Sequence, residues 1–489
     1  MAKNGWSELV FAGDAAPAVL TRAVQRGTLR RLARGIYTGD RETEPEVVVR
    51  RHLRPIVGHE FPGAVIVDRS VPDAGMASDG TLFVVHTRQR PVKLPGVVIY
   101  PRRGPGPVAG DMEYPEGLFI SSPERALLDN LVPSRAQVHR TLDRSELEAW
   151  IERLLQQRRD VGLNELRDRA REIADELDRH HEMVQLDRLV SAALATNDDV
   201  EAVSPAFAAR MASVPYDADR LECFGALVEY LDGLAPDTIP ALDVDADRRR
   251  LLSFYEAYFS NFIEGTEFTL DEAAEIVFEG VVPGERPADA HDVLGTYEIV
   301  SNPLEMRQSP HNADELEALL RARHAVLMGS RPNQNPGQYK RRENRAGSTI
   351  FVSWELVPGT LRRGFDLGAR LTSPMARAIY MMFLTAEIHP FTDGNGRLAR
   401  VMMNAELESA AEVPIVIPTV YRGNYLAALK GATHTSHFQA LCAMLAFARR
   451  WTARVDFSDR EHAEQDLKRT NALRDSAEAD DVGVHLILP

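Results

Sequence analysis

The stretch HPFTDGNGRLAR, from His389 to Arg400, decides the fold of the C-terminal half of the chain. Before it, residues 373–388 begin with a Ser-Pro pair typical of a helix start and continue as small and apolar residues, which predicts a buried helix. Pro390 ends that helix, because proline has no backbone N–H to donate. Residues 398–407 predict a second helix. The stretch is therefore a loop that leads into a helix N-terminus, a place where anions bind.

The loop carries the side chains that phosphate binding requires. Gly394 and Gly396 allow a tight turn and bring backbone amides close to a ligand. Asp393 is a hard oxygen ligand of the kind that holds nucleotide-bound magnesium. Arg397 and Arg400 lie three residues apart on the second helix, so both can face one phosphate chain. We therefore expect the loop to bind the phosphates of a nucleotide.

His389 lies at the rim of this loop, where a pKa near neutrality suits removal of a proton from an incoming hydroxyl. Each residue taken alone has a plainer interpretation, a glycine turn between two core helices with an aspartate and two arginines at the surface. The complete run in this order favours the phosphate site.

The run resembles the Fic family, because it fills every defining position of the signature His-x-Phe-x-Asp/Glu-Gly-Asn-Gly-Arg-x-x-Arg. The resemblance extends more loosely from about Leu251 to Trp451 and implies an all-α Fic fold with a β-hairpin flap. Fic proteins mostly transfer AMP from ATP to a protein hydroxyl, so it implies a protein adenylyltransferase. Some members use another nucleotide donor or remove AMP, and both alternatives stay open.

The resemblance also implies a role for each residue of the loop. His389 would be the base for the target hydroxyl, and Asp393 would be the ligand of Mg²⁺. It assigns the α-phosphate to Asn395 with the amides of Gly394 and Gly396, the β-phosphate to Arg397 and the γ-phosphate to Arg400. The implied cofactor is Mg²⁺, and the implied partners are ATP and a protein target, which includes the protein itself.

A second motif lies upstream, where Ser260 and Glu264 are four residues apart before Gly265. Four residues bring the two side chains to one helix face, and glycine commonly ends a helix, so an ordinary helix end is the plain interpretation. Beside a Fic core the pattern resembles the inhibitory motif Ser/Thr-x-x-x-Glu-Gly/Asn. This resemblance implies that Glu264 pairs with Arg400 in the place of the γ-phosphate and holds the enzyme autoinhibited.

Two further features belong to the same resemblance. Residues 339–344 and 350–352 are short extended runs that predict a hairpin, which is either a plain connection or the flap that binds a target by strand addition. The resemblance places Tyr425 and Asn424 beside the adenine, although core packing explains a tyrosine equally well. His434 and His437 lack a third metal ligand and are expected at the surface.

The N-terminal part of the chain contains a basic run. Arginine recurs between residues 22 and 34 without an intervening acid, at Arg22, Arg26, Arg30, Arg31 and Arg34. The last four are candidate DNA contacts, while a solvated arginine-rich face fits the composition equally well. The run 26–37 and the stretch 121–129 resemble the winged helix and a later helix start of AbiEi-type antitoxins. This resemblance implies a DNA-binding or toxin–antitoxin module, so a DNA-binding regulator that senses nucleotide is the second hypothesis.

We expect a multi-domain, mainly α-helical protein. Residues 81–85 and 97–100 predict strands, so the first domain is α+β. Residues 142–211 are charged and helical, either a connector or the lower half of the first domain. The expected parts are 1–135 as the winged-helix-containing domain, 136–240 as the connector, 241–455 as the Fic domain with its inhibitory helix, and 456–489 as a helical tail.

Bulk composition narrows the class of protein. The chain has 489 residues, enough for two or three cores, with 44% hydrophobic and 26% charged residues. A net charge of −15 argues against a protein wrapped in nucleic acid but permits a local basic patch. Cys223 and Cys442 lack metal-like spacing. No segment predicts a membrane span or a signal peptide, so we expect a cytoplasmic protein with no membrane partner; a homodimer is expected from the resemblance alone.

Overall fold

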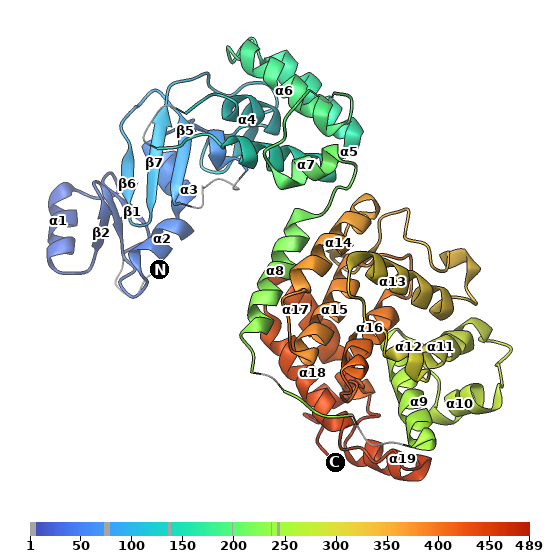
Figure 1. The fold of residues 1–489 in the computed structure, drawn as a ribbon. Coiled ribbons are helices and arrows are strands. Elements are labelled where there is room, and N and C mark those ends of the chain that lie inside the picture. The colour runs from blue at the N-terminus through green and yellow to red at the C-terminus, as the bar shows by residue number, and fades with distance from the viewer. Residues whose placement is uncertain (1–5, 73–78, 135–137, 198, 236, 242–244) are drawn as a thin grey trace. The chain divides into compact units, whose positions relative to one another are not determined.

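The computed structural model describes residues 6–72, 79–134, 138–197, 199–235, 237–241 and 245–489. It divides the chain into two compact units, Met1–Ser213 and Val214–Pro489, each with its own core (Figure 1). The boundary expected near residues 234–240 falls inside the second unit, and Pro236 within it lies outside the described residues. In the described part of the chain, no helix is both long enough and apolar enough to cross a membrane.

The first unit is mixed α and β, as the sequence predicts. Its elements are β1 (Val10–Phe11), α1 (Pro17–Gln25), β2 (Arg30–Ala33), β3 (Ile36–Thr38), α2 (Pro45–Arg51), α3 (Leu53–Glu60), β4 (Val65–Ile66), β5 (Thr81–Val85), β6 (Val92–Leu94), β7 (Val97–Arg102), β8 (Met112–Tyr114), β9 (Leu118–Ile120), α4 (Pro123–Asn130), α5 (Arg144–Ile173), α6 (His180–Ala193) and α7 (Pro205–Met211). A short 3₁₀ helix, η1, spans Asp68–Ser70.

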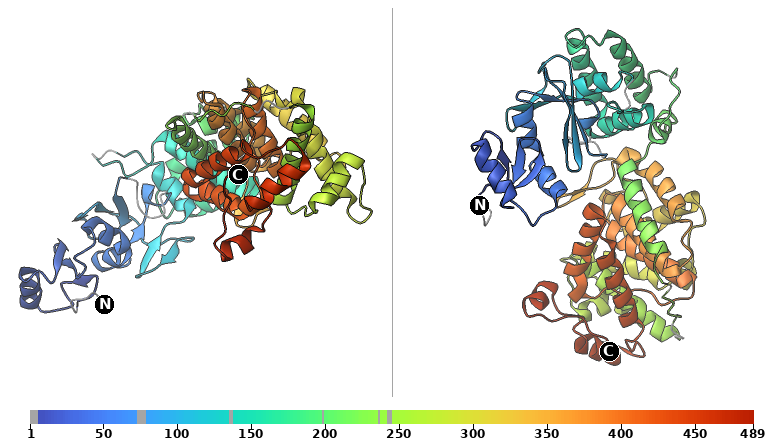
Figure 2. Two further views of the ribbon diagram at one scale, coloured as in Figure 1. Left: turned by 90° about the horizontal axis from the view of Figure 1, so that it is seen from below. Right: turned by 90° about the vertical axis from the view of Figure 1, so that its left-hand side faces the viewer.

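The strands form two sheets. A small antiparallel sheet has the order β1-β3-β2, and a mixed sheet of six strands has the order β6-β7-β5-β4-β9-β8. The pair β5–β7 is parallel, with Thr81 opposite Val98. Every residue of β5 is buried, which fits its central position. Leu82 and Val84 pack against α2 and α3, whereas neighbouring residues of the strand face the other side, and Figure 2 shows helices on both sides of this sheet.

The charged helices that were expected as a connector are divided between the two units. Helices α5, α6 and α7 pack on α4 through one core that includes Trp150, Leu166, Leu186 and Phe207. These helices are charged overall but each carries an apolar face, and burying those faces against α4 makes them the lower half of the first unit. The sequence had left open whether they form a connector or the lower half of the first domain. The last helix of the expected connector, α8 (Ala218–Asp232), lies in the second unit.

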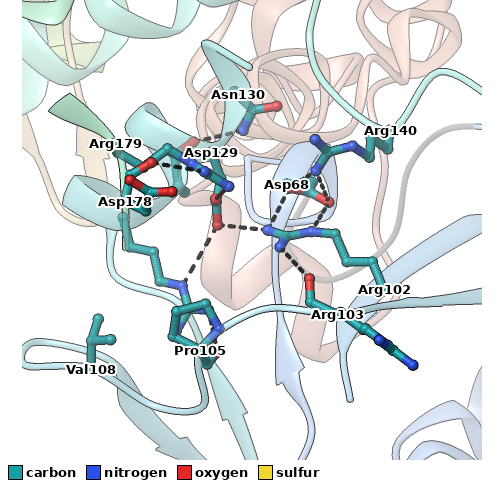
Figure 3. Close-up of polar contacts among 12 residues, drawn as sticks. Asp68, Arg102, Arg103, Pro105, Val108, Asp129, Asn130, Arg140, Asp178 and Arg179 are labelled. Atoms are coloured by element: carbon teal, nitrogen blue, oxygen red, sulfur yellow. Dashed lines mark hydrogen bonds and ion pairs between the residues drawn. The ribbon is translucent and has the colours of Figure 1, made fainter. Parts of the chain in front are cut away.

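A buried ion network joins the sheet of the first unit to its helices (Figure 3). Arg102, from β7, binds both carboxylate oxygens of Asp68 at 2.8 and 2.9 Å, and lies 2.8 Å from a carboxylate oxygen of Asp129 on α4. Arg140 also contacts Asp68, and Arg179 contacts Asp129. Burial raises the pKa of Asp68 despite the attraction of Arg102. Arg102 therefore neutralises two carboxylates that have little contact with water.

The described residues of the second unit are helical apart from a β-hairpin and an isolated bridge between Pro240 and Glu412. After α8 its elements are α9 (Ala246–Ile263), α10 (Leu270–Ala274) continued by a π-helical turn η2 (Glu275–Glu279), α11 (Pro287–Val300), α12 (Pro303–Met306), α13 (Ala313–Leu327), β10 (Arg345–Ala346), β11 (Thr349–Ile350), α14 (Val357–Gly368), α15 (Pro374–Ile388), α16 (Asn395–Ser409), α17 (Arg422–Thr435), α18 (Phe438–Thr452), α19 (Arg460–Arg469) and α20 (Ser476–Asp481). Short 3₁₀ helices are η3 (Pro332–Gln334), η4 (Trp354–Leu356) and η5 (Thr419–Tyr421).

Helices α15 and α16 lie against each other at the centre of this unit. The predicted N-cap is present, since the Ser373 side chain accepts a hydrogen bond from the Ala376 N–H. The second helix begins at Asn395, three residues before its predicted start. The prediction for the hairpin was wrong in its bounds: the paired strands are Arg345–Ala346 and Thr349–Ile350, and residues 339–344 are not a strand. Lys340 instead donates its backbone N–H to the Pro390 carbonyl, which uses the group that a strand would need.

The segment expected as a tail is part of the core of the second unit. Trp451 is fully buried and its indole N–H donates to the Thr470 hydroxyl at 3.0 Å. Leu467 and Leu486 pack in the same cluster as Tyr255 and other aromatic residues of α9. Residues of α19 thereby share a core with α9, and α20 contacts α17 and η5, so these helices belong to the second unit and do not extend freely.

We predict that Arg102→Met strongly destabilises the first unit. The change keeps the volume but leaves Asp68 and Asp129 without their shared cation, and breaking a buried ion pair costs about 3–5 kcal/mol. Urea denaturation of the full-length protein measures the loss. The matched control is Arg171→Met, which breaks exposed pairs with Asp168 and Asp187 and should cost less than about 1 kcal/mol. Equal effects of the two changes would contradict the role of Arg102 as a shared buried cation.

Candidate active site

Helix α15 ends by presenting His389. The backbone of His389 adopts a left-handed conformation, with φ of 53°, and its N–H still donates to the Thr385 carbonyl. Non-glycine residues rarely adopt such angles, which are found most often at turns and functional sites. Pro390 follows and prevents the helix from continuing. The histidine is thus held at the junction between the helix and the loop.

The surroundings of His389 keep its ring neutral. Burial lowers its pKa to about 4, and the nearby cation of Lys340 acts in the same direction. A neutral ring that donates from Nδ1 to the Ala386 carbonyl, 3.1 Å away, leaves Nε2 with a free lone pair. The ring of Phe351 stacks on the imidazole with centroids 3.7 Å apart. His389 can therefore act as a base at neutral pH, and the Phe351 ring covers one face of its imidazole.

The loop after His389 is closed by Asn395. The side chain of Asn395 accepts a hydrogen bond from the Phe391 N–H and donates one to the Phe391 carbonyl, both at 2.9 Å. Because both polar groups are used and the residue is buried, its side chain shapes the loop in this structure. The predicted contact of Asn395 with an α-phosphate would fall to its backbone and to the neighbouring glycine amides.

His324, on α13, also supports the loop, and no local motif in the sequence indicates it. Its Nδ1 lies 2.9 Å from the Gly337 N–H and its Nε2 lies 3.0 Å from the Asp393 carbonyl, so Nδ1 accepts and Nε2 donates. The ring stacks on Phe391 with centroids 3.8 Å apart. Burial lowers the pKa of His324 to about 4, which maintains this neutral tautomer.

Arg397 is buried and held by acceptors from other helices. Its Nη1 lies 2.8 Å from a carboxylate oxygen of Asp292 on α11 and donates to the Asn261 side chain at 3.3 Å. Arg331 binds the same aspartate. Asp292 and Asn261 were not predicted, because nothing local in their sequence indicates a contact with a loop more than a hundred residues away. The Arg397 guanidinium is consequently fixed in position near the start of α16.

Arg400 joins the loop helix to the upstream motif. Its Nε donates to the Ser260 hydroxyl at 2.9 Å, and its Nη2 donates to a Glu264 carboxylate oxygen at 2.7 Å and to the Ser260 carbonyl at 2.8 Å. The arginine side chain is only 5% exposed, whereas the glutamate is 36% exposed. The structure therefore brings together the pair that the resemblance implied, at the C-terminal end of α9.

The Glu264 carboxylate also lies over the N-terminus of α16. A Cβ atom added at Gly396 would overlap this carboxylate. Glycine is thus required here for the anion to reach the first turn of the helix, where free N–H groups and the helix dipole attract negative charge. Any phosphate that binds the same turn and Arg400 has to displace Glu264.

A cavity of about 180 Å³ opens beside these groups. Its lining includes Glu264, Phe351, His389, Gly396, Arg400, Tyr425, Leu426, Leu429, Lys430 and Thr433. Tyr425 is 1% exposed and lies behind Arg400, with its hydroxyl against the Met382 sulfur, so it forms the back wall. Asn424, the other residue expected beside the adenine, does not line this cavity: it is exposed and lines a different hollow, because it lies on another face of α17 from Tyr425. Leu426 and Leu429 are apolar residues of α17 in this lining that were not predicted from the sequence.

The hairpin β10–β11 borders the cavity through Ala346 and Thr349. Arg220, on α8, donates to the Ile350 carbonyl at 2.6 Å and pairs with Glu387, two residues before His389. His434 is exposed, as predicted, and its Nε2 lies 3.0 Å from the Thr349 hydroxyl. The hairpin is thus held on both sides next to the histidine.

Asp393, in the loop between α15 and α16, has an exposed carboxylate. One of its oxygens accepts the Gly394 N–H at 2.6 Å, and among the described residues no protein donor binds the other oxygen in competition with a ligand. Within the same part of the chain, no group of three or more His, Cys, Asp or Glu side chains could hold a metal ion alone. A single carboxylate fits Mg²⁺ that is carried largely by phosphate oxygens and water.

The four candidate DNA contacts lie in the first unit, with Arg26 at the end of α1, Arg30 and Arg31 in β2, and Arg34 in the turn to β3. Arg26, Arg31 and Arg34 are exposed, and they form no ion pair with the described residues. Arg30 is half-buried and donates to the Thr43 carbonyl. The described residues 6–40 contain one helix and a three-stranded sheet, so the winged-helix assignment stays a prediction.

Comparison with known proteins identifies one family. Residues 314–407 match the Fic/DOC family. Protein adenylyltransferase Fic of Nematostella vectensis is 28% identical over 273 residues, which are 52% of this chain and 60% of that protein. Protein adenylyltransferase fic-1 of Caenorhabditis elegans is 27% identical over 182 residues, 36% of each chain. The chain thus spans 60% and 36% of the length of these two curated relatives.

Among solved structures, Fic-1 (residues 134–508) from C. elegans is 20% identical, with a TM-score of 0.34 and coverage of 69% of this chain and 99% of that one. A Fic domain containing signaling protein from Bacteroides thetaiotaomicron is 20% identical, with a TM-score of 0.36 and coverage of 49% and 99%.

We predict that the stability of the second unit falls as the pH is lowered from about 6.5 to 4. In the unfolded chain His324 binds a proton near pH 6.5, whereas in the folded chain it resists one until about pH 4, so acid favours unfolding over this range. Over this pH range His324 should lower the free energy of unfolding by about 3 kcal/mol. Urea denaturation between pH 4 and 7 should show a shallower pH dependence in His324→Gln, which keeps a donor for the Asp393 carbonyl. Equal slopes in both proteins would contradict the prediction.

Proposed function

Because the C-terminal part of this chain contains a Fic domain, we propose that the protein is an autoinhibited adenylyltransferase that moves AMP from ATP to a hydroxyl of a protein. The observation that carries the proposal is the arrangement around the start of α16. A neutral histidine with a free Nε2, Gly396 and the buried Arg400 line one cavity, and Glu264 occupies the anion position beside them. The buried Arg397 lies on the same helix as Arg400.

In the proposed reaction, His389 Nε2 takes the proton of the target hydroxyl as its oxygen attacks the α-phosphorus. The new P–O bond replaces the bond to the leaving pyrophosphate. Arg397 and Arg400 hold the phosphate tail, and the loop amides stabilise the charge that develops on the α-phosphate. Asp393 would hold Mg²⁺, which supplies further neutralisation of the phosphates when bound. The side chains of α17, above all Leu426 and Leu429, would pack against the base.

The resting protein is proposed to be inhibited by Glu264. Its carboxylate uses the Arg400 donors and the helix N-terminus that the γ-phosphate needs, so ATP binds without its productive geometry. The same glutamate could instead position water for removal of AMP, and a donor other than ATP would use the same phosphate contacts. These variants of the activity share the site and differ in the labelled product.

Label transfer from α-labelled ATP with Mg²⁺, to the protein itself and to lysate proteins, tests this function. Glu264→Gly should raise labelling by about tenfold or more, because a charge-assisted competitor for Arg400 is removed. Adding His389→Ala should abolish the signal, since the base is lost. The matched control is Glu267→Gly, three residues away and without a contact to Arg400. Unchanged labelling in Glu264→Gly, with ATP still bound, would overturn the proposal in favour of AMP removal, another donor or a regulator.

A second function, DNA binding by the first unit, is favoured by the exposed arginines of β2 and the following turn. We predict that Arg31→Ala with Arg34→Ala weakens retention on duplex DNA and reduces the slope of log affinity against log salt by about 0.9 for each phosphate that is no longer neutralised. AMP transfer should stay unchanged. Arg50→Ala, an exposed arginine on α2, is the control. Loss of labelling without loss of DNA retention would refute the assignment of these roles to the two units.

A further inference from the structure

Helices α9 and α16 are joined by polar contacts at successive levels. The levels are Arg249 with Glu408, Glu256 with Asn404, Ser260 with Arg400, and Glu264 with Arg400 beside Gly396. Glu256, Ser260 and Glu264 are four residues apart on α9. Asn404, Arg400 and Gly396 are four residues apart on α16, so each set lies on one helix face. From the first level to the last, the contacts move toward the C-terminus of α9 and toward the N-terminus of α16. We call these residues the polar seam.

The middle level of the seam is the most deeply buried. Asn404 is fully buried and Glu256 is 6% exposed. The Asn404 amide donates to Glu256 Oε1 at 2.8 Å and to the Ile415 carbonyl at 3.1 Å, and its Oδ1 accepts from the Ile415 N–H at 2.8 Å. Because its donor and acceptor groups are all engaged, the amide has one orientation. Glu256 can therefore meet it in only one register of α9.

We propose that Glu256 and Asn404 are positioning residues that fix the register of α9 on α16 and so hold Glu264 on Arg400. The proposal deepens the proposed function and rests on it for its effect on activity. A shift by one helical turn moves a side chain by about 5.4 Å, more than a hydrogen bond allows. Glu256 lies two turns from Glu264 on the same face, so the register set at Glu256 determines whether the carboxylate reaches the arginine.

The protonation of Glu256 supports this arrangement. Burial raises its pKa to about 8, and Glu408 acts in the same direction, while Asn404 and Arg249 oppose it. The other charged groups facing it are Arg307 and Glu412, which line the same small cavity of about 80 Å³. Glu256 is thus mainly neutral at pH 7 and accepts one hydrogen bond without introducing a buried charge.

The sign of the pH effect follows from these values. When α9 is released, Glu256 ionises at its ordinary pKa near 4.5, whereas in the docked helix it keeps its proton to about pH 8. Between these pH values the released state binds fewer protons, so docking weakens as the pH rises, and it levels off above pH 8. His389 contributes nothing to this trend, because its pKa of about 4 leaves it neutral throughout.

Hydrogen exchange of the α9 amides, measured on the full-length protein without nucleotide at pH 7, tests the register directly. Glu256→Ala should speed this exchange by about tenfold, whereas the isosteric Glu256→Gln should not speed it, because the amide can still accept from Asn404 and does not ionise when α9 is released. Unchanged exchange of α15 in the same samples reports an intact core. The matched control is Glu406→Gln, a buried glutamate on α16 that pairs with Arg377, outside the seam. Unchanged α9 exchange in Glu256→Ala would overturn the proposal.

Label transfer gives a second readout. Glu256→Ala should raise labelling in the wild-type background and add nothing in Glu264→Gly, where no carboxylate remains to be positioned. Between pH 6 and 8, labelling by the wild type should rise about tenfold relative to Glu256→Gln. An equal effect of Glu256→Ala in both backgrounds would overturn the positioning role. Faster α9 exchange in Glu256→Ala, together with no gain of labelling in Glu264→Gly, would support the register proposal and reject the proposed function.

Discussion

One electropositive place, the N-terminus of α16 with Arg400 beside it, determines how the second unit is built. A helix start attracts an anion whether the anion comes from a ligand or from the protein itself. Here a carboxylate from α9 occupies it, and the glycine at 396 leaves just enough room. The cavity, the neutral histidine and the hairpin are arranged around this position, and under the proposed function a nucleotide phosphate would have to replace the carboxylate there.

The groups around the N-terminus of α16 are held in position by residues far away in the sequence. Asp292 and Asn261 fix one arginine, Ser260 fixes the other, and His324 fixes the loop through its backbone. None of these interactions is local in sequence. A loop with free amides would otherwise lose conformational entropy on binding, and the buried interactions bear that cost during folding. The site is therefore organised before any ligand arrives.

The sequence was sufficient for what depends on local chemistry. The helix ending at Ile388 and the loop that follows it were predicted from their residues, as were the strands at 81–85 and 97–100. The Glu264–Arg400 pair was implied only by the family resemblance, since its distance is not contained in the sequence. The sequence was insufficient where contacts between residues far apart in the chain determine the local structure. Residues 339–344 have the composition of a strand, but the backbone of Lys340 is bonded to Pro390, and the actual hairpin lies further along the chain.

The same limit explains the other differences. Asn424 and Tyr425 are adjacent in sequence, and only the orientation of α17 decides that one faces the cavity and the other does not. His324 is one histidine among 14, and its stacking on Phe391 requires the fold to be known. The charged helices 144–193 carried an apolar face whose partner, α4, could not be identified from composition.

The packing of Phe457 and α19 beside α9 bears on the order in which the chain is made. The loop that carries His389 is complete once α18 has been synthesised, but Phe457, which packs against Tyr255 of α9, and helix α19 follow later in the chain. Domains fold as their residues leave the ribosome, beginning from the N-terminus. The loop of the proposed phosphate site is therefore synthesised before all the residues that pack on α9, and a nascent chain passes through a stage in which α9 lacks part of this support.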